Sequence, residues 1–248
     1  MNGKEMNSRA YWMSGDALAS GRPEAYFPFF DGKKHVISLV GGGGKSTLLE
    51  YLARCFAARG MRTAIMTTTR MACPAHVCAD MTDCRACWAR EEYAACGRRA
   101  ENGKFRVPDD ALLKALMEET DVLIVEADGS HRLACKAPAE HEPVILPESD
   151  IVIGVMGLEV MGCAVGEVCH RPQYVCALLG CEMEHLLTAA DMAQILVSQS
   201  GTRKNVGARD YYVVLNKCDD AQRRRHGETV LAELKKRGQE NAVLTSFA

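Results

Sequence analysis

The sequence predicts an α/β protein with a doubly wound, mostly parallel β-sheet, and three observations support this prediction. Residues 36–47 read VISLVGGGGKST, an apolar strand followed by four glycines and the start of a helical pattern. Residues 122–125 and 151–155 are continuous apolar runs, which are typical of strands covered on both faces. Helical stretches separate these runs, and strands that alternate with helices favour a parallel sheet.

The glycine-rich stretch has the order of a phosphate-binding loop, so the predicted sheet is of the P-loop NTPase type. Glycines let the backbone turn tightly and bring its N–H groups to phosphate oxygens, and the following helix points its positive end at the same anion. Lys45 would reach the terminal phosphates, and the hydroxyl of Ser46 would bind Mg²⁺. The candidate nucleotide-binding residues of this loop are Gly41, Gly42, Gly43, Gly44, Lys45, Ser46 and Thr47.

One position departs from the commonest phosphate-loop pattern. The form GxxxxGK[ST] needs glycine at position 39, where this chain has leucine, whereas the shorter form GGxGK[ST] fits Gly41 to Ser46. The alternative interpretation is a glycine-rich turn from strand to helix that binds no ligand.

The first third of the chain is expected to lead into the sheet and then leave it. Residues 1–31 carry no clear period and are predicted to be an irregular lead-in, whose aromatic side chains pack onto a nucleotide-binding domain spanning residues 32–248. A helix should follow the glycine loop and end near Gly60. Residues 63–67 should form a strand that runs into a series of threonines, and residues 71–107 are a cysteine-rich excursion from the sheet.

The rest of the chain continues the alternation of helices and strands. The expected elements are a helix opened by Pro108 and Asp109, the two apolar strands named above, a loop-rich connection over residues 156–184, a helix over residues 186–197 opened by Thr188, a strand over residues 212–215, a charged helix capped by Asp219 or Asp220, and a last strand over residues 243–245.

An acidic sequence follows the second apolar strand, where Glu126-Ala127-Asp128-Gly129 stands at its carboxyl end. Phosphate-loop enzymes place the group that holds Mg²⁺ at this point, directly or through water. We therefore expect Glu126 or Asp128 to share the metal with Ser46, and we expect Lys45, Glu126 and Asp128 to be the catalytic residues. The alternative is a strand end that is simply rich in turn-forming residues.

A third candidate sequence is Asn216-Lys217-Cys218-Asp219, directly after another apolar strand. Guanine offers an N1–H and an exocyclic amine, and the carboxylate of Asp219 can accept both hydrogen bonds, whereas adenine has no 2-amino group. The stem of Lys217 would lie along the base, and Asn216 would brace the loop. The sequence therefore favours GTP over ATP as the nucleotide.

The cysteines are numerous and unevenly distributed. Five of the twelve fall between residues 73 and 96, and Cys84 and Cys87 have the spacing of metal ligands. Together with Cys73, Cys78, Cys96 or His76 they could hold zinc or an Fe–S cluster. No second CxxC is present, so the sequence favours reduced, buried thiols over a metal site.

Composition and charge exclude several classes of partner. The chain has 32 acidic and 30 basic residues, so its net charge predicts neither nucleic-acid binding nor membrane association. No apolar run approaches the roughly 18 residues of a membrane span, and the first thirty residues lack the apolar core of a secretory signal. We therefore expect a cytoplasmic protein.

With these motifs assembled, the sequence resembles the selenium-dependent hydroxylase accessory protein family, also called YqeC-like. The resemblance extends from about residue 37 to residue 219. It rests on LVGGGGKST, the threonines at 67–69, LIVEADGS at 123–130, KAPAEHEPVI at 136–145, His170-Arg171-Pro172 and LNKCD at 215–219. One departure is Arg70, which stands where a histidine is expected after the threonines.

The resemblance implies an accessory role in the maturation of molybdenum hydroxylases that carry a labile selenium. The leading hypothesis is thus a factor that uses GTP, or ATP, to load or release a selenium or molybdenum cofactor, with such a hydroxylase or its cofactor-loading machinery as partner. In this setting Lys136, Glu140, His141 and Glu142 could bind a cofactor or respond to the γ-phosphate, and His170 with Arg171 could bind an anion.

Two other classes of function stay open. The first is a small-molecule kinase acting on a cofactor precursor, which would use the same glycine loop but would not need the guanine-specific sequence. The second is a non-catalytic nucleotide-sensing scaffold, which would bind GTP or GDP without turnover.

Overall fold

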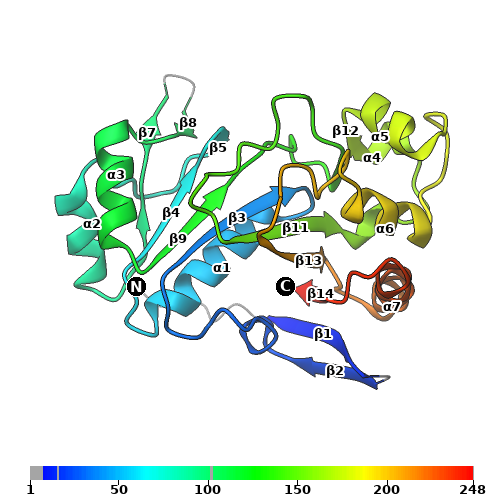
Figure 1. Ribbon diagram of the computed structural model, residues 1–248, viewed down its shortest axis with the longest axis horizontal. Coiled ribbons are helices and arrows are strands. Elements are labelled where there is room, and N and C mark those ends of the chain that lie inside the picture. The colour runs from blue at the N-terminus through cyan, green and yellow to red at the C-terminus, as the bar shows by residue number, and fades with distance from the viewer. Residues whose placement is uncertain (1–7, 16, 101–102, 248) are drawn as a thin grey trace.

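The core of the protein is a nine-stranded sheet in the order β2-β1-β14-β13-β11-β3-β9-β4-β6. The computed structural model describes residues 8–15, 17–100 and 103–247 (Figure 1). The strands of this sheet are β1 (Arg9–Ser14), β2 (Ala17–Gly21), β3 (His35–Gly41), β4 (Thr63–Thr67), β6 (Ala94–Ala95), β9 (Val122–Glu126), β11 (Ile151–Gly157), β13 (Asp210–Asn216) and β14 (Ala242–Ser246).

Seven neighbouring strands of this sheet, from β14 to β6, run parallel. The strand that ends in the glycine loop, β3, lies between β11 and β9 and pairs with both. Every residue of β9 and β11 is buried, as their continuous apolar runs predicted. The predicted α/β class and the mostly parallel sheet are therefore confirmed.

Helices cover both faces of the sheet because each strand alternates its apolar side chains between two cores. On one face, α1 (Lys45–Ala57) packs its leucines and Phe56 against β3, β9 and β11. On the other face, α2 (Met81–Trp88) and α3 (Asp110–Glu119) cover one half of the sheet. The other half is covered by α6 (Ala189–Val197) and α7 (Ala221–Lys236).

The N-terminal segment is not the irregular lead-in that the sequence predicted. β1 and β2 form a hairpin, and β1 adds antiparallel to β14, the last strand of the chain. This pairing could not be seen locally because β1 is specified by a partner more than 200 residues away. The expected packing of the aromatic residues is confirmed, since Phe27 and Phe29 are 3% exposed and join the core beneath α1. Residues 1–7 and residue 16 lie outside the described residues.

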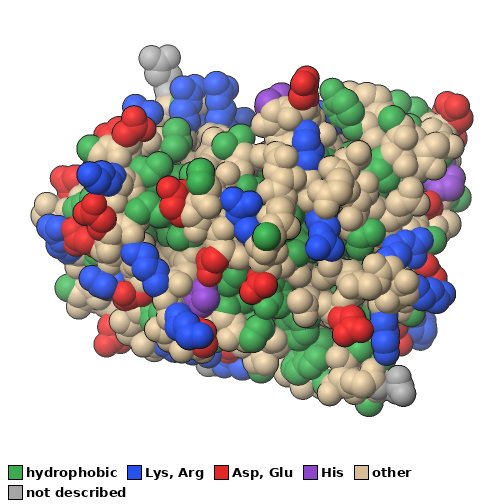
Figure 2. Space-filling view, viewed as in Figure 1, with side chains coloured by type: hydrophobic (Ala, Val, Ile, Leu, Met, Phe, Trp, Pro, Cys, Tyr) green, Lys and Arg blue, Asp and Glu red, His purple; other side chains and the backbone are tan. Residues whose placement is uncertain are grey.

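The segment predicted as an excursion carries structure of its own. β5 (Arg70–Ala72), β8 (Lys104–Arg106) and β7 (Arg98–Arg99) form a small antiparallel sheet, and β6 returns to the main sheet beside β4. Figure 2 shows a group of basic side chains over β7 and β8, whereas acidic and basic side chains are interspersed over much of the rest of this face.

The predicted helix starts are formed by the expected capping side chains. Asp109 accepts a hydrogen bond from the first turn of α3, Thr188 forms a capping box with Asp191 at α6, and Asp220 rather than Asp219 caps α7. Short elements occupy the connections: η1 (Pro23–Ala25), β10 (Cys135–Lys136), η2 (Leu158–Val160), α4 (Val165–Val168), β12 (Cys169–His170) and α5 (Pro172–Leu179). Among the described helices, none is both long and apolar enough to cross a membrane.

Candidate functional site

The glycine loop joins the end of β3 to the start of α1, and its glycines are required by the packing around it. Gly41, Gly43 and Gly44 have φ angles of +96°, +78° and +113°, which side chains other than glycine rarely adopt. A Cβ atom on Gly43 would lie 2.1 Å from the amide nitrogen of Gly157, and one on Gly44 would lie 2.2 Å from the side-chain nitrogen of Asn216. The loop therefore passes closely between β11 and β13.

The first three backbone amides of the glycine loop already have partners within the protein. Gly41 donates to both carboxylate oxygens of Asp128, at 3.1 and 3.0 Å, and Gly42 and Gly43 donate to backbone carbonyls of neighbouring segments. By contrast, no side chain among the described residues caps the start of α1. The positive end of α1, at Lys45 and Ser46, is therefore the part of the loop that is suited to binding an anion.

Lys45 lies at the centre of a buried group of charges. Its ammonium donates to the carbonyl of Gly41 and lies 3.1 Å from Oδ1 of Asp128. The ammonium of Lys136 lies 3.2 Å from the other carboxylate oxygen of Asp128. These three side chains are only 1–3% exposed, so each charge depends on its neighbours for compensation.

The same network continues into the loops that carry the other motifs. Lys136 is 2.7 Å from Glu142, and Glu142 also pairs with Arg171. Charges of alternating sign thus run from Lys45 through Asp128, Lys136 and Glu142 to Arg171. The sequence suggested that Lys136 and Glu142 bind a cofactor or respond to the γ-phosphate and that Arg171 binds an anion, and the structure connects all three to the glycine loop.

Ser46 and Glu126 form the second pair at the start of α1. The hydroxyl of Ser46 donates to Oε2 of Glu126 at 2.9 Å, and Glu126 is 6% exposed. Burial raises the pKa of Glu126 above its ordinary value, an effect that the charge of Lys45 and the hydrogen bond from Ser46 oppose. Of the three predicted metal ligands, Ser46 and Glu126 are in contact, whereas Asp128 pairs with the two lysines. Thr47, which the sequence predicted to bind the nucleotide, is exposed.

The Asn-Lys-Cys-Asp sequence lies beside the glycine loop, at the end of β13. Asn216 donates its side-chain amide to the carbonyl of Gly43 at 2.9 Å and accepts a hydrogen bond from Thr245. This contact holds the end of β13 against the loop.

The other two residues predicted to contact a base already have protein partners. Lys217 forms an ion pair with Glu159, and Asp219 accepts hydrogen bonds from Ser246 at 2.7 Å and Arg223 at 3.2 Å. The side chains of Lys217 and Asp219 remain 40% and 37% exposed. Asp219 also keeps acceptor capacity, because an ionised carboxylate has about four acceptor positions.

Three buried polar atoms near these networks have no hydrogen-bond partner within the described residues: Oε2 of Glu159, Nδ1 of His170 and the hydroxyl of Thr202. Thr202 lines a small crevice with Gly41, Asp128 and Lys136. Burial, reinforced by the charge of Lys136, lowers the pKa of His170 to about 4. Glu159 and Thr202 lie outside every recognisable motif, so only the fold identifies them.

Together the fold and the site define an α/β protein whose glycine loop lies at the carboxyl edge of a parallel sheet, among paired acidic and basic side chains. Residues 37–173 match the family model described as "YqeC protein". The chain is also 34% identical over 200 residues to the "Uncharacterized protein YqeC" of Escherichia coli (strain K12), an alignment that covers 75% of this chain and 78% of that protein. The chain belongs to the YqeC family, and the resemblance predicted from its motifs is confirmed.

Proposed function

We propose that this protein binds a nucleoside triphosphate with Mg²⁺ at the glycine loop, in the manner of a P-loop NTPase, and that GTP is the favoured nucleotide. The observation that carries the proposal is the start of α1, which has no side-chain cap in the described structure and brings Lys45 together with the pair Ser46–Glu126. A helix end with this set of side chains is suited to an anion that carries a hard cation.

The donor chemistry of these residues fits a magnesium-bound nucleotide. Ser46 and Glu126 offer a hydroxyl and a carboxylate, which are oxygen ligands of the kind that Mg²⁺ prefers, directly or through water. Bound Mg²⁺ would neutralise charge on the phosphates. Lys45 would supply a further positive charge at the terminal phosphates.

Asp128 supplies the link between nucleotide and the rest of the molecule. Its carboxylate accepts the Gly41 amide and contacts Lys45, so a bound phosphate would compete with it for the same lysine. Because Asp128 also contacts Lys136, such competition would reach Glu142 and Arg171 through the ion pairs already described. The nucleotide state could therefore change the loops after β9 and around β12.

Within the YqeC family this coupling suits an accessory factor in the maturation of selenium-dependent molybdenum hydroxylases. In this proposal the loops that respond to nucleotide would face the hydroxylase or its cofactor-loading machinery. A small-molecule kinase would use the same loop, and base preference and phosphate transfer to a small acceptor separate the two.

The test is calorimetric titration of the full chain with GTP in the presence of Mg²⁺. Lys45→Ala is expected to abolish measurable binding and to lower stability, because Lys45 is a buried member of the charge network, but the protein should still fold since Asp128 keeps both Lys136 and the Gly41 amide. Lys33→Ala is the matched control, because Lys33 is a surface lysine whose side chain is 78% exposed. Equal GTP affinity in the wild type and Lys45→Ala, or no binding by the wild type, would sink the proposal.

A further inference from the structure

Four cysteines converge at one place although they come from three segments of the chain. Cys78 precedes α2, Cys84 and Cys87 lie on α2, and Cys96 follows β6. The sulfur atoms of Cys78 and Cys87 are 3.6 Å apart, and those of Cys84 and Cys96 are 3.2 Å apart. All four belong to the same buried cluster of the core and are here called the thiol cluster. Each member is at most 2% exposed.

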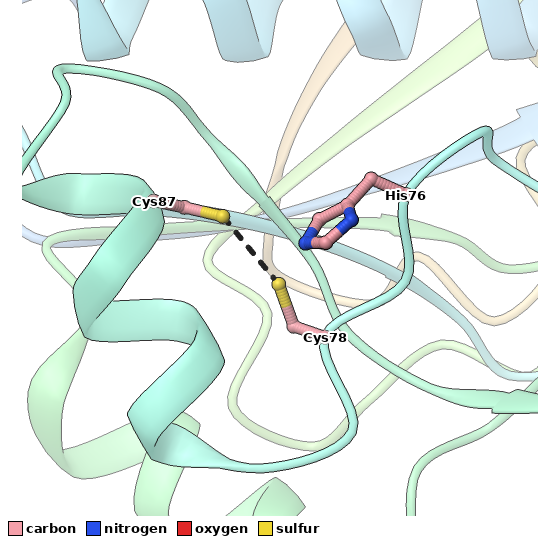
Figure 3. A group of neighbouring side chains, drawn as sticks. All are labelled: His76, Cys78 and Cys87. Carbon is pink, nitrogen blue, oxygen red and sulfur yellow. Dashed lines mark hydrogen bonds between the residues drawn. The ribbon is translucent and has the colours of Figure 1, made fainter.

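His76 adds a nitrogen ligand to this group. Figure 3 shows its imidazole directed toward the sulfurs of Cys78 and Cys87 from the loop that leads to α2. One ligand atom from each of these three residues lies within 4.8 Å of the other two. His76 is exposed and lines, with Cys87, a cavity of about 650 Å³ between α1 and the excursion. An ion could therefore enter from solvent on this side.

The sulfur spacing points to a single metal ion. A tetrahedral zinc ion with Zn–S bonds of about 2.3 Å holds two thiolates about 3.8 Å apart, close to the 3.6 Å between Cys78 and Cys87. An Fe–S cluster places several iron and sulfide atoms between its cysteines and needs a wider arrangement. A disulfide needs sulfur atoms about 2.05 Å apart, and these thiols are free.

The surrounding structure favours the same conclusion. The buried residues of α2 are Cys84 and Cys87, so the helix presents thiols to the core where a helix of this length would normally bury branched side chains. A metal would tie α2 to the Cys78 loop and to the end of β6. The guanidinium of Arg90 lies 3.7 Å from the sulfur of Cys87, where it can offset the negative charge of bound thiolates.

We propose that the excursion contains a zinc site in which His76, Cys78, Cys84 and Cys87 are the ligands. Cys84 completes the set because it shares a CxxC sequence with Cys87 on α2, and its sulfur, 3.2 Å from that of Cys96, lies just outside the group of His76, Cys78 and Cys87. On binding, each of the three thiols releases its proton to solvent and the imidazole coordinates in its neutral form, so no oxidant or reductant is involved. The site is separate from the glycine loop and does not depend on nucleotide.

The first test is the zinc content of the reduced full chain by mass spectrometry of the metal, after reconstitution with Zn²⁺. One zinc per chain is expected in the wild type, and Cys78→Ser and Cys87→Ser should lose it. Cys73→Ser is the matched control, since Cys73 lies in the same excursion but outside the thiol cluster, and it should keep the metal. A wild type that takes up no zinc, or Cys78→Ser with wild-type zinc content, would overturn the site.

The second test avoids the buried positions, where a variant could fail to fold. His76 is exposed, so His76→Ala should leave the circular dichroism spectrum unchanged and weaken zinc binding about tenfold or more in competition with a chelator. Co²⁺ substitution of the wild type should give the absorption bands of tetrahedral thiolate-bound cobalt. Unchanged zinc affinity in His76→Ala, or an intact mass that shows disulfides within the thiol cluster, would contradict the proposal.

Discussion

At the scale of single residues, two carboxylates only two positions apart have different surroundings. Glu126 accepts from the hydroxyl of Ser46, whereas Asp128 accepts from the Gly41 amide and contacts two lysines. The sequence placed both at the carboxyl end of β9 and made both candidates for holding Mg²⁺ with Ser46. It could not separate them, because their partners are decided by how the loop after β9 turns toward β3 and β10.

The base preference of the proposed nucleotide site rests on Asp219. A carboxylate that accepts two hydrogen bonds from guanine should give at least a tenfold preference for GTP over ATP, since each charged hydrogen bond contributes about 1.5–3 kcal/mol. Asp219→Asn should shift the preference toward XTP, because its amide can donate to the 2-oxo group of xanthine. Competition among GTP, ATP and XTP for both proteins measures the change.

Asp220→Asn is the matched control for this experiment. Asp220 is the adjacent carboxylate and caps α7, and because asparagine caps helices about as well, the change should leave the cap in place and the ratio of GTP to ATP affinity unchanged. Equal binding of GTP and ATP by the wild type would make the Asn-Lys-Cys-Asp sequence a coincidence and would favour the kinase alternative.

His35 makes the stability of the protein depend on pH. Its ring nitrogens lie 2.6 Å from Asp150 and 3.0 Å from Asp31. Burial alone would lower the pKa of His35, but the hydrogen bonds and charges of these carboxylates outweigh it and raise the pKa above its ordinary value. The resulting stabilisation is fully present below the unfolded pKa of about 6.5 and is lost as the pH rises through the folded pKa.

We therefore expect His35→Gln to lower the free energy of unfolding more at about pH 5.5 than at about pH 8.5. Urea unfolding of wild type and variant at both pH values gives the comparison, in which the titration of groups that do not contact His35 cancels. His141→Gln, a change in an exposed histidine, should show no such difference. A larger loss for His35→Gln at the higher pH would mean that the ion pairs do not act as described.

At the scale of elements, the glycine loop is limited by packing as well as by any ligand. Strand, loop and helix follow one another in the sequence, so periodicity and glycine content were sufficient to predict them. The contacts of the loop with Gly157 and Asn216 come from β11 and β13, which are more than 100 residues away. The need for glycine at each position therefore has a tertiary cause.

Comparing Gly43→Ala with Gly60→Ala tests whether tertiary packing requires glycine at position 43. Both glycines have a positive φ, of +78° and +75°, but a Cβ on Gly43 would clash with the backbone of Gly157, whereas the space around Gly60 is open. Gly60→Ala should lower the free energy of unfolding by about 1 kcal/mol, through backbone strain alone. Gly43→Ala should cost about 1–3 kcal/mol more.

Urea unfolding of the three proteins measures these costs. If the two alanine variants lose the same stability, the loop around Gly43 moves away from β11 easily, and its glycine is not required for packing.

At the scale of the whole molecule, one line of charges, buried except for the half-buried Arg171, joins segments that are far apart in the chain. It begins at the glycine loop, passes through the loops after β9 and at β10, and ends beside β12. Each charged side chain in the line has an opposite charge on both sides, except Lys45 and Arg171 at its two ends. A buried network of this kind stabilises one arrangement of the loops, because removing a member leaves its partner charged and poorly solvated.

Glu142→Gln should therefore destabilise the protein by about 2 kcal/mol or more, since it leaves Lys136 and Arg171 without their shared carboxylate. Glu140→Gln is the matched control, two positions earlier in the same motif, where the side chain is exposed. That change should stay within about 0.5 kcal/mol of the wild type in urea unfolding. Equal effects of the two substitutions would show that Glu142 is not part of a stabilising network.

The sequence by itself determined the class of the fold, the glycine loop, the helix starts at Asp109 and Thr188, a third helix start at Asp219 or Asp220, and the family. These features depend on the order and spacing of neighbouring residues, which local periodicity and capping chemistry reveal. It also identified the motifs that meet at the glycine loop, but not the contacts between them.

Only the tertiary structure decided which side chains meet. The pairing of β1 with β14, the placement of Glu126 against Ser46 and of Asp128 against Lys45, and the convergence of the thiol cluster all join residues from separate segments. Such contacts follow from strand register and from the packing of connections over the sheet. No periodicity in the sequence records them, because their free energy arises between segments that are adjacent only in the folded chain.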